Sequence, residues 1–254
     1  MSTRTIAAIV AGVVAVGGAG AWFMLRSSGD STPAAVATHK APAAASSKLA
    51  APHTRAAAMK VATRVFAVLP AQLPGWKVEG KPTFDPGDKG ADPATKAINR
   101  CLAAATGGGI GVDSADVVHR TAVPTFMSVG VTLGFMRTPA KAAADLAVLR
   151  KASTQQCLAR TVVGQTVSLG SGSTMRFTSM KSVRVPGRAV GMQFDGRITS
   201  NVIGDQSVRV VMIAAVDRAT EILVTSAGLG AALPLSTDVR VLNTIVAQTH
   251  RVIA

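Results

Sequence analysis

The sequence predicts an α+β domain in which helices cover one face of an antiparallel β-sheet, preceded by a single N-terminal transmembrane helix and a flexible spacer. Residues 6–25 carry no charge, and a helix of that length spans about 30 Å, the thickness of the hydrocarbon core of a bilayer. Residues 27–55 are rich in Ala, Pro, Ser and Thr and show no apolar periodicity, which is typical of a disordered spacer. The rest of the chain combines helical spacing with short strands separated by turn residues.

The chain therefore divides into four parts: a short tail at 1–4, a transmembrane anchor or signal helix at 5–26, the spacer at 27–55 and one domain at 56–254. The apolar run is longer than the h-region of an ordinary signal peptide. Trp22 and Phe23 just before Arg26 are typical of an interfacial anchor. We favour a retained anchor in the plasma membrane, and cleavage with secretion is the alternative. Charge alone does not decide the orientation, but the short tail and the cysteine pair favour a domain outside the cytoplasm.

Composition limits the partners that this chain can have. Hydrophobic residues make up 48% and charged residues 16%, which predicts a packed domain. The formal net charge of +14 favours anionic lipids or acidic cell-wall polymers. Aromatic residues make up only 4% and the cations are scattered along the chain, which argues against nucleic acid. We expect a small envelope ligand or a membrane-protein partner, with anionic lipid or wall polymer as further candidates.

The domain opens with two helices and a loop. Apolar residues recur at helical spacing from Met59 to Leu69, until Pro70 ends the run. Residues 77–92 predict a loop with at most a short strand. A second helix is expected over about 93–105, where it carries Cys101 and ends at a glycine run.

The remainder predicts a strand pair, two helices, four strands and a last helix. Thr138-Pro139 begins the first of these helices in the preferred order of cap and proline. Gly187, Gly204 and Asp217 mark turns between the later strands. Strands are expected at about 114–123, 125–136, 175–183, 189–199, 207–216 and 219–226, and helices at about 139–149, 153–162 and 235–253. Consecutive strands joined by tight turns predict an antiparallel sheet with helices on one face.

Cys101 and Cys157 are the two cysteines of the chain, so only one intramolecular pairing exists. Outside the cytoplasm a disulfide is the default expectation, and closing this loop would stabilise the fold by roughly 4 kcal/mol. Inert free thiols are the alternative. No CxxC or CxxxH spacing occurs, so we expect no metal site.

No residue pattern predicts catalysis. Residues 75–82 resemble a GxxxxGK phosphate loop, but a proline stands where a Mg²⁺-binding Ser or Thr is needed. Outside the spacer the imidazoles are His119 and His250. Asp113 and Asp116 near His119 are interpreted as turn residues, and an enzymatic hypothesis would need a buried cluster of His119 with Asp113 or Asp116. We expect a protein that is not an enzyme, with no catalytic residue and no cofactor.

Several motifs occur together in order: LPxxLPGW, an early helical Cys, SVGVTLGF, AAADLAVL, a second Cys in QQCL, QSVRVVMIAA and a final amphipathic helix. This combination resembles the PknH-type extracytoplasmic sensor domains of actinobacterial membrane proteins and the related LpqN-type envelope lipoproteins. The resemblance implies a Mog1/PsbP-like α/β sandwich over about 56–254, with a cleft for an unknown ligand. It also implies a helix-to-helix disulfide between Cys101 and Cys157. This chain lacks a kinase domain, a lipid-bearing cysteine and the second disulfide of many such sensor domains.

We therefore expect a membrane-anchored, extracytoplasmic, non-catalytic binding or sensor-like module of the cell envelope. The alternatives are a scaffold partner in an envelope complex and a secreted protein. Trp76 and Phe126 are candidates for the lining of the cleft, and packing in the core is the alternative for both.

Overall fold

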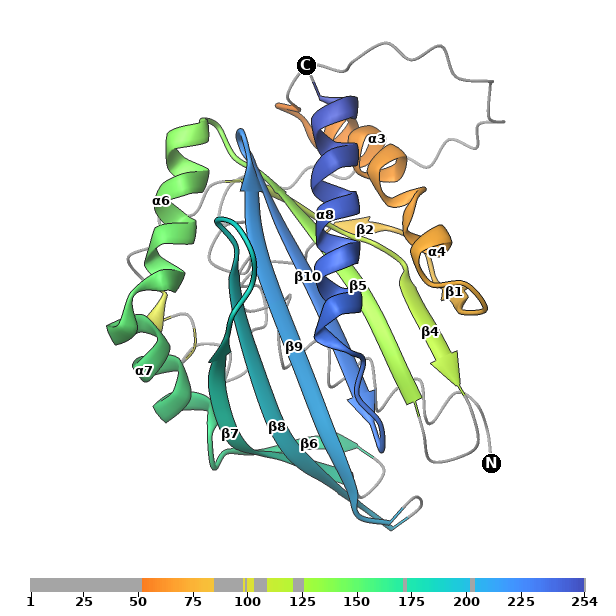
Figure 1. The fold of residues 1–254 in the computed structure, drawn as a ribbon, viewed down its shortest axis with the longest axis vertical. Coiled ribbons are helices and arrows are strands. Elements are labelled where there is room, and N and C mark those ends of the chain that lie inside the picture. The colour runs from red at the N-terminus through yellow and green to blue at the C-terminus, as the bar shows by residue number, and fades with distance from the viewer. Residues whose placement is uncertain are drawn as a thin grey trace.

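The computed structural model describes residues 52–84, 98, 100–102, 109–120, 126–170, 173–201 and 204–253 (Figure 1). The transmembrane helix predicted at 5–26 and most of the predicted spacer lie outside these residues. Among the residues that are described, no helix is both long and apolar enough to cross a membrane.

A ten-stranded antiparallel sheet forms the centre of the domain. Its main path runs β1 (Lys77–Glu79), β4 (Asp116–Arg120), β5 (Phe126–Phe135), β10 (Thr220–Leu229), β9 (Gln206–Asp217), β8 (Val190–Ser200), β7 (Ser173–Val183) and β6 (Thr166–Gly170). Off this path, β2 (Thr83–Phe84) pairs with β3 (Ile110–Asp113), and β3 pairs with β5. The antiparallel sheet predicted from the tight turns is confirmed, and β7 to β10 lie where the four late strands were predicted.

Helices cover both faces of this sheet (Figure 1). The helices α3 (Arg55–Phe66), α4 (Leu69–Gln72) and α8 (Leu235–Val252) pack over one side, which we call the α8 face, and α6 (Pro139–Arg150) and α7 (Ala152–Val162) pack over the other, the α6 face. Separate cores fill the two sides. The core of the α8 face includes Leu133, Ile213 and Ile245, and that of the α6 face includes Leu149 and Leu223. Every residue of β10 is buried, so the prediction that helices cover only one face is wrong.

Local sequence explains how two of the helices begin. The side chain of Thr54 accepts a hydrogen bond from the Ala57 N–H, and Thr138 caps α6 in the same way. Pro70, however, does not end a helix as predicted: α3 stops at Phe66, and Pro70 lies in the first turn of α4. A proline is favourable there because the first turn of a helix needs no N–H donor.

A β-bulge interrupts the strand that was predicted at 114–123. Asp113 pairs with Thr132 and Val117 with Val129, so the segment between β3 and β4 holds one residue more than the matching segment of β5. The Ser114 hydroxyl accepts a hydrogen bond from the Val131 N–H at 2.9 Å and fills the gap in the ladder. The extra residue turns the side chains of Asp113 and Asp116 toward the same face of the sheet.

Candidate functional site

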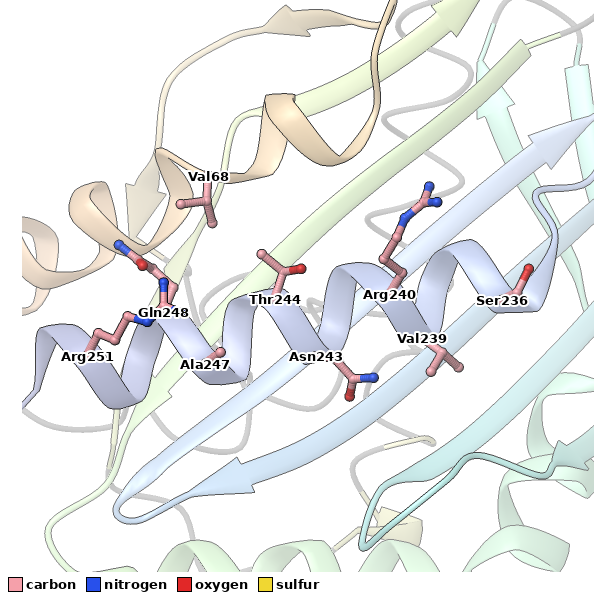
Figure 2. Close-up of a pocket in the computed structure, with 9 residues that line it drawn as sticks. All are labelled: Val68, Ser236, Val239, Arg240, Asn243, Thr244, Ala247, Gln248 and Arg251. Carbon is pink, nitrogen blue, oxygen red and sulfur yellow. The ribbon is translucent and has the colours of Figure 1, made fainter.

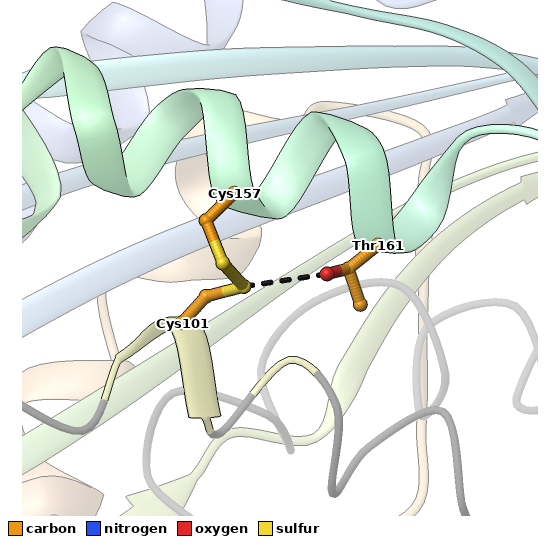
Figure 3. The surroundings of a disulfide bond; sticks show 3 residues. All are labelled: Cys101, Cys157 and Thr161. Carbon is orange, nitrogen blue, oxygen red and sulfur yellow. Dashed lines mark hydrogen bonds between the residues drawn. A yellow bond between two sulfur atoms is a disulfide. The ribbon is translucent and has the colours of Figure 1, made fainter.

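Cys101 and Cys157 form a disulfide that joins a short helical turn to α7 (Figure 3). Their Cα atoms lie 5.6 Å apart, and the Cys101 Sγ lies 3.3 Å from the Thr161 Oγ1 one turn further along α7. Leu102 follows Cys101 and is buried in the core of the α6 face, so the disulfide fastens this turn over that core. The predicted pairing is confirmed. Most of the helix predicted at 93–105 lies outside the described residues.

The two residues proposed to line a cleft lie in different cores. Trp76 packs against the core of the α8 face and stacks on His119, with ring centroids 5.4 Å apart. Phe126 is 3% exposed and belongs to the core of the α6 face. The structure therefore does not bring Trp76 and Phe126 together, and both contribute to packing.

Acidic side chains gather beside the bulge on the α6 face. Glu79 lies directly opposite Asp116 in the β1–β4 pairing, and Asp113 accepts a 2.6 Å hydrogen bond from Thr132. Burial raises the pKa of Asp116 to about 6, and the negative charges of Asp113 and Glu79 add to the rise. Burial also raises the pKa of Asp113, although the Thr132 hydrogen bond opposes it. These aspartates lie in strands, not in the turn that the sequence suggested.

His119 does not join this acidic group. It lies three residues from Asp116 on the same regular strand, so the two side chains point to opposite faces of the sheet. The imidazole stacks on Trp76, whereas Asp116 faces the α6 side. The contact that the enzymatic hypothesis required, between His119 and Asp113 or Asp116, is not formed. The other candidate imidazole, His250 at the end of α8, is exposed and its Nδ1 lies 3.3 Å from the Asp217 Oδ1. In the described part of the chain, no three His, Cys, Asp or Glu side chains are placed to hold a metal ion.

An open basic pocket lies on the α8 face, where β7 and β8 extend beyond the cover of α8. Arg176 and Arg197 are directly opposite each other in the β7–β8 pairing, and both are exposed. The adjacent cross-strand pair on the same face is Thr174 with Thr199. We call this hollow of about 460 Å³ the sheet pocket; its lining is Val163, Gly164, Thr166, Thr174, Arg176, Phe177, Thr178, Arg197, Thr199 and Asp205.

A second groove of about 470 Å³ follows the outer side of α8 (Figure 2). Three of its polar side chains hold helices together. Arg240 donates to the Gln72 carbonyl at 3.3 Å, the Thr244 hydroxyl donates to the Gln72 side chain at 3.2 Å, and Gln248 donates to the Arg64 carbonyl at 3.4 Å. Because these side chains fasten α3 and α4 to α8, the sheet pocket is the better candidate for a ligand.

Sequence reasoning did not single out Arg176 or Arg197. The signal was present in part, because polar and apolar residues alternate in STMRFT and in GRITS, so an Arg and a Thr share one face of each strand. What the sequence does not contain is the register that places the two arginines side by side.

The fold and the site define a disulfide-linked α+β domain with a two-sided antiparallel sheet and an open basic pocket. No family model matches the chain, and neither does any curated protein. Among solved structures, the chain is similar to the extracellular domain of PknH from Mycobacterium tuberculosis, with 12% identity, 74% of this chain and 90% of that chain covered, and a TM-score of 0.43. It is also similar to an uncharacterized protein of Mycobacterium smegmatis, the Rv0999 ortholog, with 14% identity, coverage of 75% and 96%, and a TM-score of 0.32.

Proposed function

We propose that this protein is a non-catalytic binding module of the cell envelope, of the PknH-like sensor type. Its N-terminal apolar segment holds it in the plasma membrane as a single-pass anchor, and the domain works outside the cytoplasm. The ligand occupies the sheet pocket, while the disulfide keeps the fold intact on the outer side of the membrane.

The observation that carries this proposal is the disulfide between Cys101 and Cys157. Disulfides persist in oxidising compartments outside the cytoplasm and are rare in the reducing cytosol. The predicted anchor and spacer fit the same location. A disordered spacer of the predicted composition that ends before the Thr54 cap of α3 would have a root-mean-square length of about 30 Å, which would leave the domain free to turn above the bilayer.

The binding role is supported by where the free hydrogen-bonding groups lie. In the α8 groove, Arg240, Thr244 and Gln248 use their hydrogen bonds to join helices, whereas the sheet pocket offers exposed guanidinium and hydroxyl groups. The separation of His119 from Asp113 and Asp116 on opposite faces supports a role without acid-base chemistry. A scaffold role in an envelope complex stays the alternative prediction.

A thiol count in cells tests the location. Cells that make the full-length chain are lysed in excess maleimide reagent, with and without prior reduction, and the mass of the chain is measured. We expect neither cysteine to be modified without reductant and both after reduction, while a cytosolic thiol protein is modified in both samples. Modification of both cysteines without reductant would overturn the proposal.

A further inference from the structure

Arg176 and Arg197 form a pair of like charges on an open sheet face. They lie directly opposite each other on β7 and β8, where neighbouring side chains are about 4.5–5.5 Å apart at Cβ. Within the described residues neither guanidinium makes a hydrogen bond or an ion pair. Two like charges in this relation repel each other and destabilise a sheet unless an anion lies between them.

A third arginine on the same face of the sheet, Arg209, has a carboxylate partner within the protein. Asp195 and Arg209 are a cross-strand pair on β8 and β9, and the Arg209 Nε donates to the Asp195 Oδ1 at 2.6 Å. Burial alone would raise the pKa of Asp195, but hydrogen bonds from Arg209 and Gln193 outweigh it and hold that pKa below its usual range. Arg176 and Arg197 have no such carboxylate opposite them, which leaves their donors available to a ligand.

The surroundings of the two arginines form a hollow rather than a flat surface. Gly164 adopts a φ of +86°, and its N–H donates to the Phe177 carbonyl at 2.9 Å, so the turn after α7 packs closely against β7. The Arg176 Nη2 lies 3.9 Å from the point where a Cβ on Gly164 would stand. The turn therefore forms one side of the pocket next to the guanidinium, and its positive φ favours glycine at this position.

The groups that line the pocket indicate the chemistry of its ligand. Planar guanidinium groups bind phosphate oxygens in a bidentate manner, and the threonine hydroxyls beside them can donate further hydrogen bonds. Asp205 lines the same pocket, so the two arginines and one aspartate give a local charge of +1. That charge suits an anion with one negative charge, as in a phosphodiester, better than a doubly charged phosphomonoester.

We propose that the sheet pocket binds a phosphodiester group, with Arg176 and Arg197 holding its two unesterified oxygens. This inference rests on the proposed function and names the class of ligand for the same site. Figure 1 shows β6 and the start of β7 at the end of the sheet opposite to the start of α3, which follows the spacer. The pocket therefore lies at the end of the domain far from the start of α3.

Calorimetric titration of the full-length chain in nonionic detergent tests the proposal with two probes. Glycerophosphoglycerol supplies a soluble phosphodiester, and micelles doped with phosphatidylglycerol supply the same group on a lipid. We expect saturable binding of at least one probe. Binding of the soluble probe would indicate that the ligand is a free phosphodiester or part of a polymer. Binding of the doped micelles alone would indicate that the ligand is a lipid headgroup.

Variants connect the binding to the two arginines. Arg176→Gln and Arg197→Gln should each weaken binding by at least about tenfold, because each removes charged hydrogen bonds to the phosphate. Arg184→Gln is the matched control, since it removes the same charge from an exposed position outside the pocket, and it should leave the affinity within about twofold of the wild type. The melting temperatures of both pocket variants should be unchanged or higher, because each variant removes a like-charge neighbour.

Two results would overturn the inference. One is the absence of saturable binding of either probe to the wild-type chain. The other is an equal loss of affinity in Arg184→Gln, which would mean that only the overall positive charge attracts the probe. Neither result would bear on the location of the domain, because the thiol count does not depend on the pocket.

Discussion

Asp238 is a buried carboxyl group in the first turn of α8, with 1% of its surface exposed. Within the described residues neither of its oxygens has a hydrogen-bond partner of normal geometry. Burial raises its pKa to about 7, and the nearby Ser226 hydroxyl on β10 opposes this rise only in part. The helix dipole favours a negative charge at this position, but the loss of solvent outweighs that effect.

This group makes stability depend on pH. The folded state binds the Asp238 proton more tightly than the unfolded chain does, so the contribution of this group to stability is greatest below pH 4 and is lost between pH 4 and pH 7. Across that interval we expect the free energy of unfolding of the wild type to fall by roughly 2–4 kcal/mol because of this group. This part of the decrease should be absent in Asp238→Asn. Denaturant unfolding of both proteins at pH 4 and pH 8 measures the difference. The part of the loss that comes from Asp113 and Asp116 should remain in Asp238→Asn. A loss of stability in Asp238→Asn as large as that of the wild type would contradict the assignment.

At the scale of the elements, hydrophobic periodicity predicted most of the secondary structure. The final helix was expected over about 235–253 and runs from Leu235 to Val252. Turn residues likewise placed the strands β7 to β10, because Gly187 and Gly204 both adopt the positive φ that tight turns require. These features are local, so a single sequence contains them.

Elements that depend on distant partners could not be predicted in this way. The strand β6 was not predicted, because its short sequence does not indicate a strand. Its pairing with β7 gives it that conformation. The bulge between β3 and β4 arises from the register with β5, which lies elsewhere in the chain. The same reason applies to the sheet pocket: alternation showed that Arg176 and Arg197 each lie on a polar face, but only the pairing of β7 with β8 joins them.

The disulfide is the covalent link between elements on the α6 face, and it should contribute most of its stability through the unfolded chain. It joins residues 56 apart in sequence, and the chain-entropy relation gives roughly 4 kcal/mol for a loop of that size. We expect the double variant Cys101→Ser/Cys157→Ser to unfold at a correspondingly lower denaturant concentration.

Thr161→Val is the matched control for this prediction. It removes the hydroxyl that lies 3.3 Å from the Cys101 Sγ but keeps the disulfide, so the free energy of unfolding should fall by only about 1 kcal/mol. Equal denaturation midpoints for the oxidised wild type and the double cysteine variant would show that the link does not stabilise the domain.

At the scale of the whole molecule, two separate cores pack on the two faces of one sheet. The helices α3 and α8 fill one side and α6 and α7 the other, while the ends of β7 and β8 extend past α8 and leave the sheet pocket open. The stable part of the fold thus positions an exposed basic site, and of the core residues Phe177 contributes to its lining. An exposed pocket on a rigid, packed domain suits a module that binds a ligand without converting it.

The central claim is that this domain faces the outside of the cell while its N-terminal segment holds it in the membrane. Protease treatment of intact cells that carry a C-terminally tagged full-length chain tests that claim most directly. We predict that the tagged domain is cut from the intact cells within its spacer, while a cytosolic control protein survives until the membrane is permeabilised. A tag that stays protected until permeabilisation would contradict the account.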